Sequence, residues 1–125
     1  MNLLLDSHAL LWALSDPKRL SAKAQAAIVN PRHNVYYSAA SAWELEIKAA
    51  KGKLTLPEGW LAAADETGFA HLPVTAAEGR ESARLEWHHT DPFDRMLVAQ
   101  ARIHGLTFVT RDPLILPYGV KTLAA

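Results

Sequence analysis

Residues 3–7 read Leu3-Leu4-Leu5-Asp6-Ser7, three apolar side chains in succession followed by a carboxylate and a hydroxyl. A short, uninterrupted apolar run is typical of a parallel strand that is covered on both faces. The residues that follow predict a helix from about position 8 to 14, which Asp16-Pro17 stops. The chain therefore begins with a strand, a charged turn and a helix.

Working outward from this start, apolar runs and helical segments continue to alternate. Further strands are predicted at about 35–37, 69–72, 106–109 and 120–123, and further helices at about 22–29, 42–51, 57–67, 76–87 and 92–104. Capping boxes at Ser41-x-x-Glu44 and Thr75-x-x-Glu78 predict two helix starts, and Asp91-Pro92 predicts a third. Strands that alternate with helices indicate crossover connections and a mainly parallel sheet, so the fold class is α/β.

The composition limits the class of protein. The chain has 125 residues, 50% of them hydrophobic, with 13 Lys and Arg against 13 Asp and Glu, which fits a single globular domain spanning residues 1–125. It has no cysteine, which excludes disulfides, thiolate zinc sites and a cysteine nucleophile. No apolar run is long enough to cross a membrane, and no signal peptide is recognisable, so we expect a cytoplasmic protein. Zero net charge argues against a protein that coats DNA, but it is compatible with a nuclease whose metal ions carry the positive charge.

Carboxylates follow the predicted strands. Asp6 ends the first strand, Glu44 lies in the helix after the second, and Asp112 lies three residues beyond Val109. Asp94 joins them if its helix starts at the same sheet edge. In parallel sheets this carboxyl edge forms the site. Two carboxylates about 4 Å apart repel by about 4 kcal/mol at an effective dielectric constant near 20, so such a cluster requires raised pKa values or a bound cation. Oxygen ligands select Mg²⁺ or Mn²⁺, ions that activate water for phosphodiester cleavage.

Each acid also has a purely structural interpretation. Glu44 is the third residue of the helix that the predicted capping box starts, and Asp94 is the third residue of a helix capped by Asp91, where the helix dipole favours an anion. Asp112 fits a turn before proline. Asp6 is the hardest to explain structurally, because a charge at the end of a buried strand is costly without a partner.

Three cations are candidates for contact with substrate: Arg95, Arg111 and Lys48. The alternatives are a structural ion pair for the arginines and a favourable helix-end position for the lysine. We expect His88 and His89, in a polar turn, to be solvated, and the histidines have no zinc-binding spacing.

Together these residues resemble the PIN-domain family, and more closely the VapC-type toxins of bacterial toxin–antitoxin pairs. The resemblance runs in order through almost the whole chain. The matching stretches are Leu3-Leu4-Leu5-Asp6-Ser7-His8-Ala9-Leu10-Leu11-Trp12, Ser38-Ala39-Ala40-Ser41-Ala42-Trp43-Glu44-Leu45 with Ile47-Lys48, Lys51-Gly52-Lys53-Leu54, His89-Thr90-Asp91-Pro92-Phe93-Asp94-Arg95-Met96-Leu97-Val98-Ala99-Gln100-Ala101 and Thr110-Arg111-Asp112.

The resemblance implies a three-layer α/β/α sandwich and a Mg²⁺- or Mn²⁺-dependent endoribonuclease that is often dimeric and is inhibited by a cognate antitoxin. Carried over to this sequence, it implies an acidic quartet of Asp6, Glu44, Asp94 and Asp112, with Asp6 and Asp94 as the principal metal ligands. Asp91 competes with Asp94, but the pattern Asp-x-x-Leu-x-Ala favours Asp94 as the ligand and Asp91 as the cap.

Two other functions are compatible with the residues. The first is a non-catalytic RNA-binding or protein-interaction module on the same fold, in which the acids are structural, because a fold does not dictate a function. The second is a metal-dependent phosphatase. Its usual Asp-x-Asp arrangement after the first strand is not met, because position 8 is His8.

Overall fold

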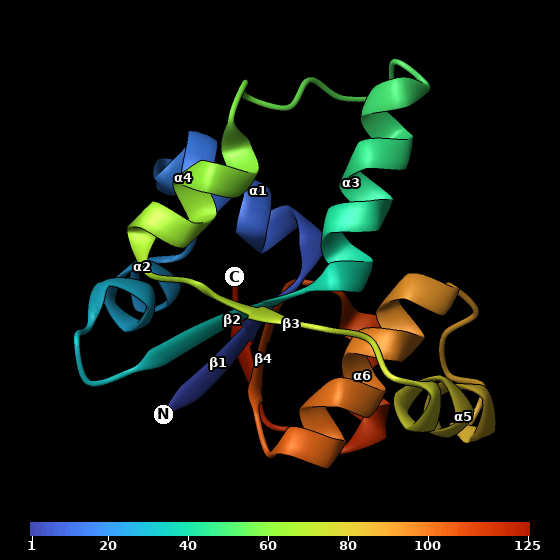
Figure 1. The fold of residues 1–125 in the computed structure, drawn as a ribbon. Helices are drawn as coiled ribbons and strands as arrows, with labels where there is room; N and C mark the ends of the chain where they lie inside the picture. The colour runs from blue at the N-terminus through green and yellow to red at the C-terminus, as the bar shows by residue number, and fades with distance from the viewer.

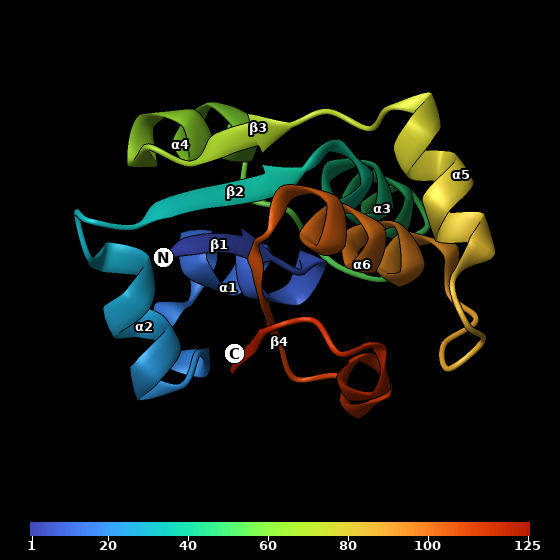
Figure 2. The same cartoon turned by 90° about the horizontal axis from the view of Figure 1, so that it is seen from below.

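The five strands form one sheet in which every neighbouring pair is parallel, in the order β3-β2-β1-β4-β5. The computed structural model describes all residues, 1–125. Helices lie on both sides of the sheet (Figures 1 and 2), which confirms the predicted α/β/α sandwich. The elements are β1 (Asn2–Leu5), α1 (Ser7–Ser15), the 3-10 helix η1 (Pro17–Arg19), α2 (Ala22–Val29), β2 (Asn34–Ser38), α3 (Ala39–Ala50), α4 (Trp60–Thr67), β3 (Ala70–Leu72), α5 (Ala76–Arg84), α6 (Pro92–His104), β4 (Thr107–Thr110), the 3-10 helix η2 (Pro113–Tyr118) and β5 (Thr122–Ala124).

The apolar run that opens the chain lies at the centre of the sheet. Leu3, Leu4 and Leu5 have no exposed surface. Leu3 and Leu5 belong to a core built with α1, α2 and α4, whereas Leu4 belongs to a second core on the opposite face, built with α6 and the chain around it. This is the double burial that a continuous apolar strand predicts.

The strand order places a candidate binding site at one edge of the sheet. Because β1 pairs with β2 on one side and with β4 on the other, the chain changes direction across the sheet at this point. In open parallel sheets, ligands bind at the carboxyl ends of the strands beside such a switch. Asp6 follows β1 directly, and its backbone N–H donates to the Val109 carbonyl at 3.1 Å, so the first acid lies beside the end of β4.

The predicted capping box at Ser41 was wrong, because α3 begins earlier. Ser38 is the N-cap, and its hydroxyl accepts from the Ala40 backbone N–H at 3.1 Å. Ser41 therefore lies within the helix, fully buried, and its hydroxyl has no partner in the chain. Glu44 therefore lies in the second turn of α3 and has no capping role.

Helix α5 is shorter than predicted, ending at Arg84 rather than near Trp87. The Arg95 guanidinium accounts for this end, since it donates to the carbonyl oxygens of Ser82 at 2.8 Å and Leu85 at 2.9 Å. Those carbonyls would otherwise lack partners at the helix terminus. The capping box at Thr75 that starts α5 is present as predicted.

Helix α6 begins and ends where the sequence indicates. Asp91 is its N-cap, Pro92 is its first residue, and Gly105 closes it with a left-handed φ of 64°.

Helix α4 begins only at Trp60, after Gly59 in the left-handed region, rather than at Pro57. No helix in the chain combines the length and the hydrophobicity that crossing a bilayer requires.

Candidate functional site

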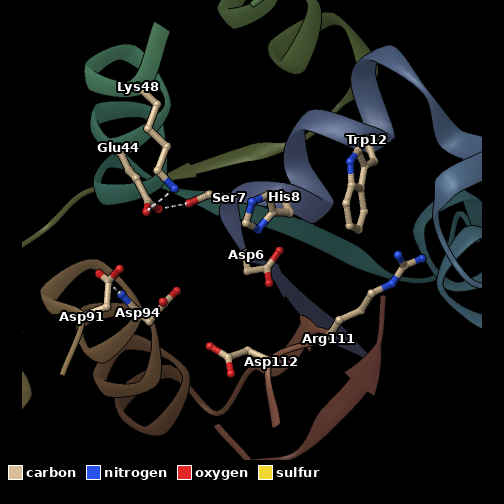
Figure 3. A pocket seen from close by; sticks show the side chains of 10 residues that line it. All are labelled: Asp6, Ser7, His8, Trp12, Glu44, Lys48, Asp91, Asp94, Arg111 and Asp112. Atoms are coloured by element: carbon tan, nitrogen blue, oxygen red, sulfur yellow. Dashed lines mark hydrogen bonds and ion pairs between the residues drawn. The ribbon is translucent and has the colours of Figure 1, made fainter. Parts of the chain in front are cut away.

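A cavity of about 340 Å³ opens at the carboxyl edge of the sheet. Its lining is almost entirely polar, and all four carboxylates that the sequence singled out contribute to it (Figure 3). The lining residues are Asp6, Ser7, His8, Trp12, Glu44, Lys48, Asp91, Asp94, Arg111 and Asp112. The acids come from the end of β1, from α3, from the start of α6 and from the segment after β4, so residues more than a hundred positions apart converge here.

Asp6 has two structural constraints at once. It is the N-cap of α1, and its Oδ1 accepts from the Ala9 backbone N–H at 2.7 Å. It is also only 7% exposed. Burial raises the pKa of Asp6, and nearby Glu44 raises it further, although the hydrogen bonds from Ala9 and Thr110 and the proximity of His8 oppose this.

Glu44 is held from two sides. Its Oε1 accepts from the Ser7 hydroxyl at 2.5 Å, and its Oε2 pairs with the Lys48 ammonium at 3.1 Å, one helical turn along α3. The residue is 6% exposed. Figure 3 shows the carboxylate reaching from α3 toward Ser7 at the start of α1. The side chain therefore connects α3 to the residue next to Asp6.

Asp94 is the cavity acid whose pKa is raised furthest. Burial raises its pKa from 3.8 to about 7, repulsion from Asp91, Glu44 and Asp6 adds to this effect, and His89 partly opposes it. Several carboxylates thus face one another in a partly enclosed space. A cation among them would offset the repulsion that adds to the effect of burial on the pKa of Asp94.

Asp112 and His89 form a contact that sequence reasoning missed. The His89 Nε2 lies 2.7 Å from the Asp112 Oδ2 and 3.2 Å from the Asp94 Oδ2. The prediction that His89 is solvated was wrong, because its side chain is only 10% exposed. Its position two residues before the helix cap Asp91 was the available sequence signal, since that spacing brings it to the end of α6 that carries Asp94.

Two of the three candidate cations lie at the cavity. Lys48 lines it beside Glu44, and Arg111 lines its rim, where the guanidinium lies 4.5 Å from the centre of the Trp12 ring. Arg111 also donates to the Ala125 carbonyl at 2.7 Å and to the Arg19 carbonyl. Both cations leave the cavity less negative than its acids alone would make it.

Arg95 does not lie in the cavity, and our expectation that it contacts substrate is revised accordingly. It is 3% exposed, and its guanidinium is 3.6 Å from the centre of the Trp87 ring. Its N–H groups donate to the carbonyls of Ser82, Leu85, Glu86 and His89 and to the Tyr118 hydroxyl. Arg95 is a structural residue that fixes the segment between α5 and α6.

The donor set fits a hard divalent cation. The cavity presents carboxylate oxygens and no sulfur ligand, and such ligands suit Mg²⁺ or Mn²⁺ rather than Zn²⁺. The raised pKa of Asp94 is consistent with this, because burial and, to a lesser extent, repulsion from neighbouring acids disfavour its charged form unless a cation is bound.

The pKa of Asp94 predicts an unusual dependence of stability on pH in the metal-free protein. Because the folded state binds this proton more tightly than the unfolded state, the stabilisation is present below about pH 4 and is lost as the pH rises through about 7. Asp94→Asn is expected to raise the free energy of unfolding near pH 8 by roughly 2–4 kcal/mol, and by little near pH 4. Urea unfolding in EDTA at both pH values measures this, and an equal effect at both would contradict it.

The comparisons with known proteins agree with this arrangement. The chain matches the PIN domain family over residues 3–116, and it belongs to that family. A search of curated proteins found no significant match.

Three solved structures share the fold. VapBC2 from Rickettsia felis bound to a DNA fragment from its promoter aligns with a TM-score of 0.73 at 14% identity, covering 98% of both chains. FitAcB from Neisseria gonorrhoeae aligns with a TM-score of 0.58 at 20% identity, covering 99% of this chain and 97% of the other. FitAB bound to an IR36 DNA fragment aligns with a TM-score of 0.63 at 18% identity, covering 98% and 94%.

Proposed function

We propose that this chain is a single-domain, Mg²⁺- or Mn²⁺-dependent endoribonuclease of the VapC type, the toxin of a toxin–antitoxin pair. The observation that carries the proposal is the convergence of Asp6, Glu44, Asp94 and Asp112 in one cavity. Membership of the PIN domain family supports it. A module without catalysis has no need for several carboxylates in one cavity, where burial and then the neighbouring acids raise the pKa of Asp94 to about 7.

The cavity residues divide into three roles. Asp6 and Asp94 are the proposed principal metal ligands, and Asp112 completes the set opposite them. A bound divalent cation supplies activation of the attacking water and neutralises charge that develops on the phosphodiester. Glu44, fixed by Ser7 and Lys48, is placed to orient the water through its carboxylate.

The cations of the cavity are suited to hold the RNA backbone. Lys48 pairs with Glu44 at 3.1 Å and keeps donors free for a phosphate oxygen, since an ammonium has three. Arg111 lies at the rim with its guanidinium against Trp12. Contacts of this kind fix the position of the backbone without reading its sequence.

The proposed partners follow from the family and the fold neighbours. The similar structures are VapBC2 and FitAB bound to DNA fragments, which supports a cognate antitoxin as the partner of this chain. We further propose that it acts in the cytoplasm on cellular RNA, as a homodimer. The edge-on packing of the exposed Trp43 against Phe93, 5.2 Å between ring centres, offers an apolar surface for association.

A cleavage assay with purified protein tests the function. RNA of mixed sequence is expected to be cut at internal positions in Mg²⁺ or Mn²⁺, to remain intact in EDTA, and to be protected when the product of the neighbouring gene is co-purified. Mapping the new RNA ends identifies the target. Cleavage that is unchanged by EDTA, or activity confined to small phosphate esters, would contradict the proposal.

A further inference from the structure

His89 is held more firmly than any role in a solvated turn would require. Its backbone N–H donates to the Tyr118 hydroxyl at 2.9 Å, and its carbonyl accepts from the buried Arg95 guanidinium at 3.1 Å. Its ring is anchored as well, because the Asp91 backbone N–H donates to Nδ1 at 3.1 Å. The backbone and one ring nitrogen are thus fixed by α6 and by the end of η2.

The contact with Asp91 determines which ring nitrogen carries the proton. A backbone N–H can only donate, so Nδ1 must be the acceptor, and the proton of a neutral imidazole must then lie on Nε2. The Nε2–H group faces the Oδ2 atoms of both Asp112, at 2.7 Å, and Asp94, at 3.2 Å. The contact with Asp112 is a hydrogen bond, and the Asp94 carboxylate lies beside the same nitrogen.

We propose that His89 is a positioning residue, a neutral imidazole whose Nε2–H donates to Asp112 and lies against Asp94, and that it thereby holds the two carboxylates at the spacing that a divalent cation requires. This inference rests on the proposed function and assigns a role to a residue outside the acidic quartet. The other oxygen of Asp94 remains free for a ligand role, whereas Oδ1 of Asp112 accepts from the Leu114 backbone N–H at 2.9 Å.

The same geometry argues against His89 as a metal ligand. The three side chains, His89, Asp94 and Asp112, lie close enough to hold an ion between them. If Nε2 bound a metal ion, the ring proton would have to lie on Nδ1. Nδ1 could then no longer accept from the Asp91 backbone N–H, and two N–H groups would face each other. The arrangement fits a donor behind the ligands, the kind of group that orients metal-binding carboxylates.

Two substitutions separate the donor from the rest of the ring. In His89→Asn the amide can still accept from the Asp91 N–H, but it is too short to reach the carboxylates. In His89→Gln an amide N–H can extend to about the position of Nε2. His88→Asn is the matched control, because the neighbouring His88 pairs with the exposed Glu86 at 2.9 Å, outside the cavity.

The measurements are the dissociation constant for Mn²⁺, from electron paramagnetic resonance of the free ion, and RNA cleavage. Loss of an outer partner typically weakens metal binding 10–100-fold, and we expect His89→Asn to weaken Mn²⁺ binding about 10-fold or more with a parallel loss of kcat. His89→Gln is expected to remain within about 3-fold of the wild type, and His88→Asn to be unchanged.

Unchanged or tighter Mn²⁺ binding by a folded His89→Asn variant would overturn the inference, as would an equal loss in the Asn and Gln variants. A wild-type chain that neither binds Mn²⁺ nor cleaves RNA would overturn the proposed function as well. Long-range ¹H–¹⁵N spectra of the metal-free wild type test the tautomer without any substitution. The Nε2–H tautomer is expected, and an Nδ1–H tautomer or a doubly protonated ring would overturn the inference.

Discussion

Asp6→Asn and Asp94→Asn are each expected to lower metal-dependent RNA cleavage by about 10³-fold or more. Such a loss corresponds to about 4 kcal/mol of transition-state stabilisation, the scale on which a bound metal ion acts. An amide is neutral and a poorer ligand than a carboxylate, so each variant removes one charge from the proposed metal site. Both residues line the same cavity, although they lie 88 positions apart by their numbers, 6 and 94.

Asparagine is chosen because it preserves the fold around both positions. Asp6 accepts from the Ala9 backbone N–H as the N-cap of α1, and asparagine is an equally good N-cap. Asp16→Asn is the matched control, because Asp16 is exposed at the other end of α1 and does not line the cavity. Circular dichroism checks folding, and initial rates in Mn²⁺ measure activity. Cleavage by a folded Asp94→Asn variant at the wild-type rate would remove this residue from the proposed metal site.

Arg95→Ala is expected to destabilise the chain by about 4 kcal/mol or more, which is a large part of the 5–15 kcal/mol typical of a domain. The substitution removes the donor for four backbone carbonyls and the Tyr118 hydroxyl. Buried acceptors without a donor cost about 1–3 kcal/mol each, although solvent will reach some of them after the change. The packing of Arg95 over Trp87 is lost as well.

Urea unfolding of three variants measures this effect. Arg95→Lys is expected to recover little of the loss, since an ammonium cannot reproduce the forked geometry that serves carbonyls on both sides of the guanidinium. Arg84→Ala, at an exposed position in the last turn of α5, is the control and is expected to change stability by no more than about 0.5 kcal/mol. A change of less than about 1 kcal/mol in Arg95→Ala would show that the carbonyls find other partners.

The fold class and the location of the acids were predictable from the sequence because both depend on local patterns. The continuous burial of residues 3–5 follows from an apolar run too short for a helix, and the parallel sheet follows from the alternation of strands and helices. Asp6 and Asp112 follow strands, so the parallel arrangement alone brings them to one edge. The position of Asp94 in the first turn of α6 was predictable because Asp91-Pro92 fixes the start of that helix.

The remaining features depend on contacts between distant segments. The predicted start of α3 differs from the observed one because Ser38 and Ser41 are both good N-cap residues. Tertiary packing buries Ser41 inside the helix, and Ser38 is the N-cap. The role of Arg95 requires carbonyls from the end of α5 and the turn after it, and His89 requires acids from two other segments. Spacing along the chain carries no information about such partners.

Strand β1 has a consequence for how this protein opens. Its side chains alternate between the two cores, with Leu3 and Leu5 in one and Leu4 in the other. If β1 left the sheet, both cores would lose buried leucines at the same time. The first acid of the cavity is attached directly to that segment. Local fluctuations that loosen the helices therefore leave Asp6 in place, and the position of this acid is lost only in the cooperative transition that melts both cores together.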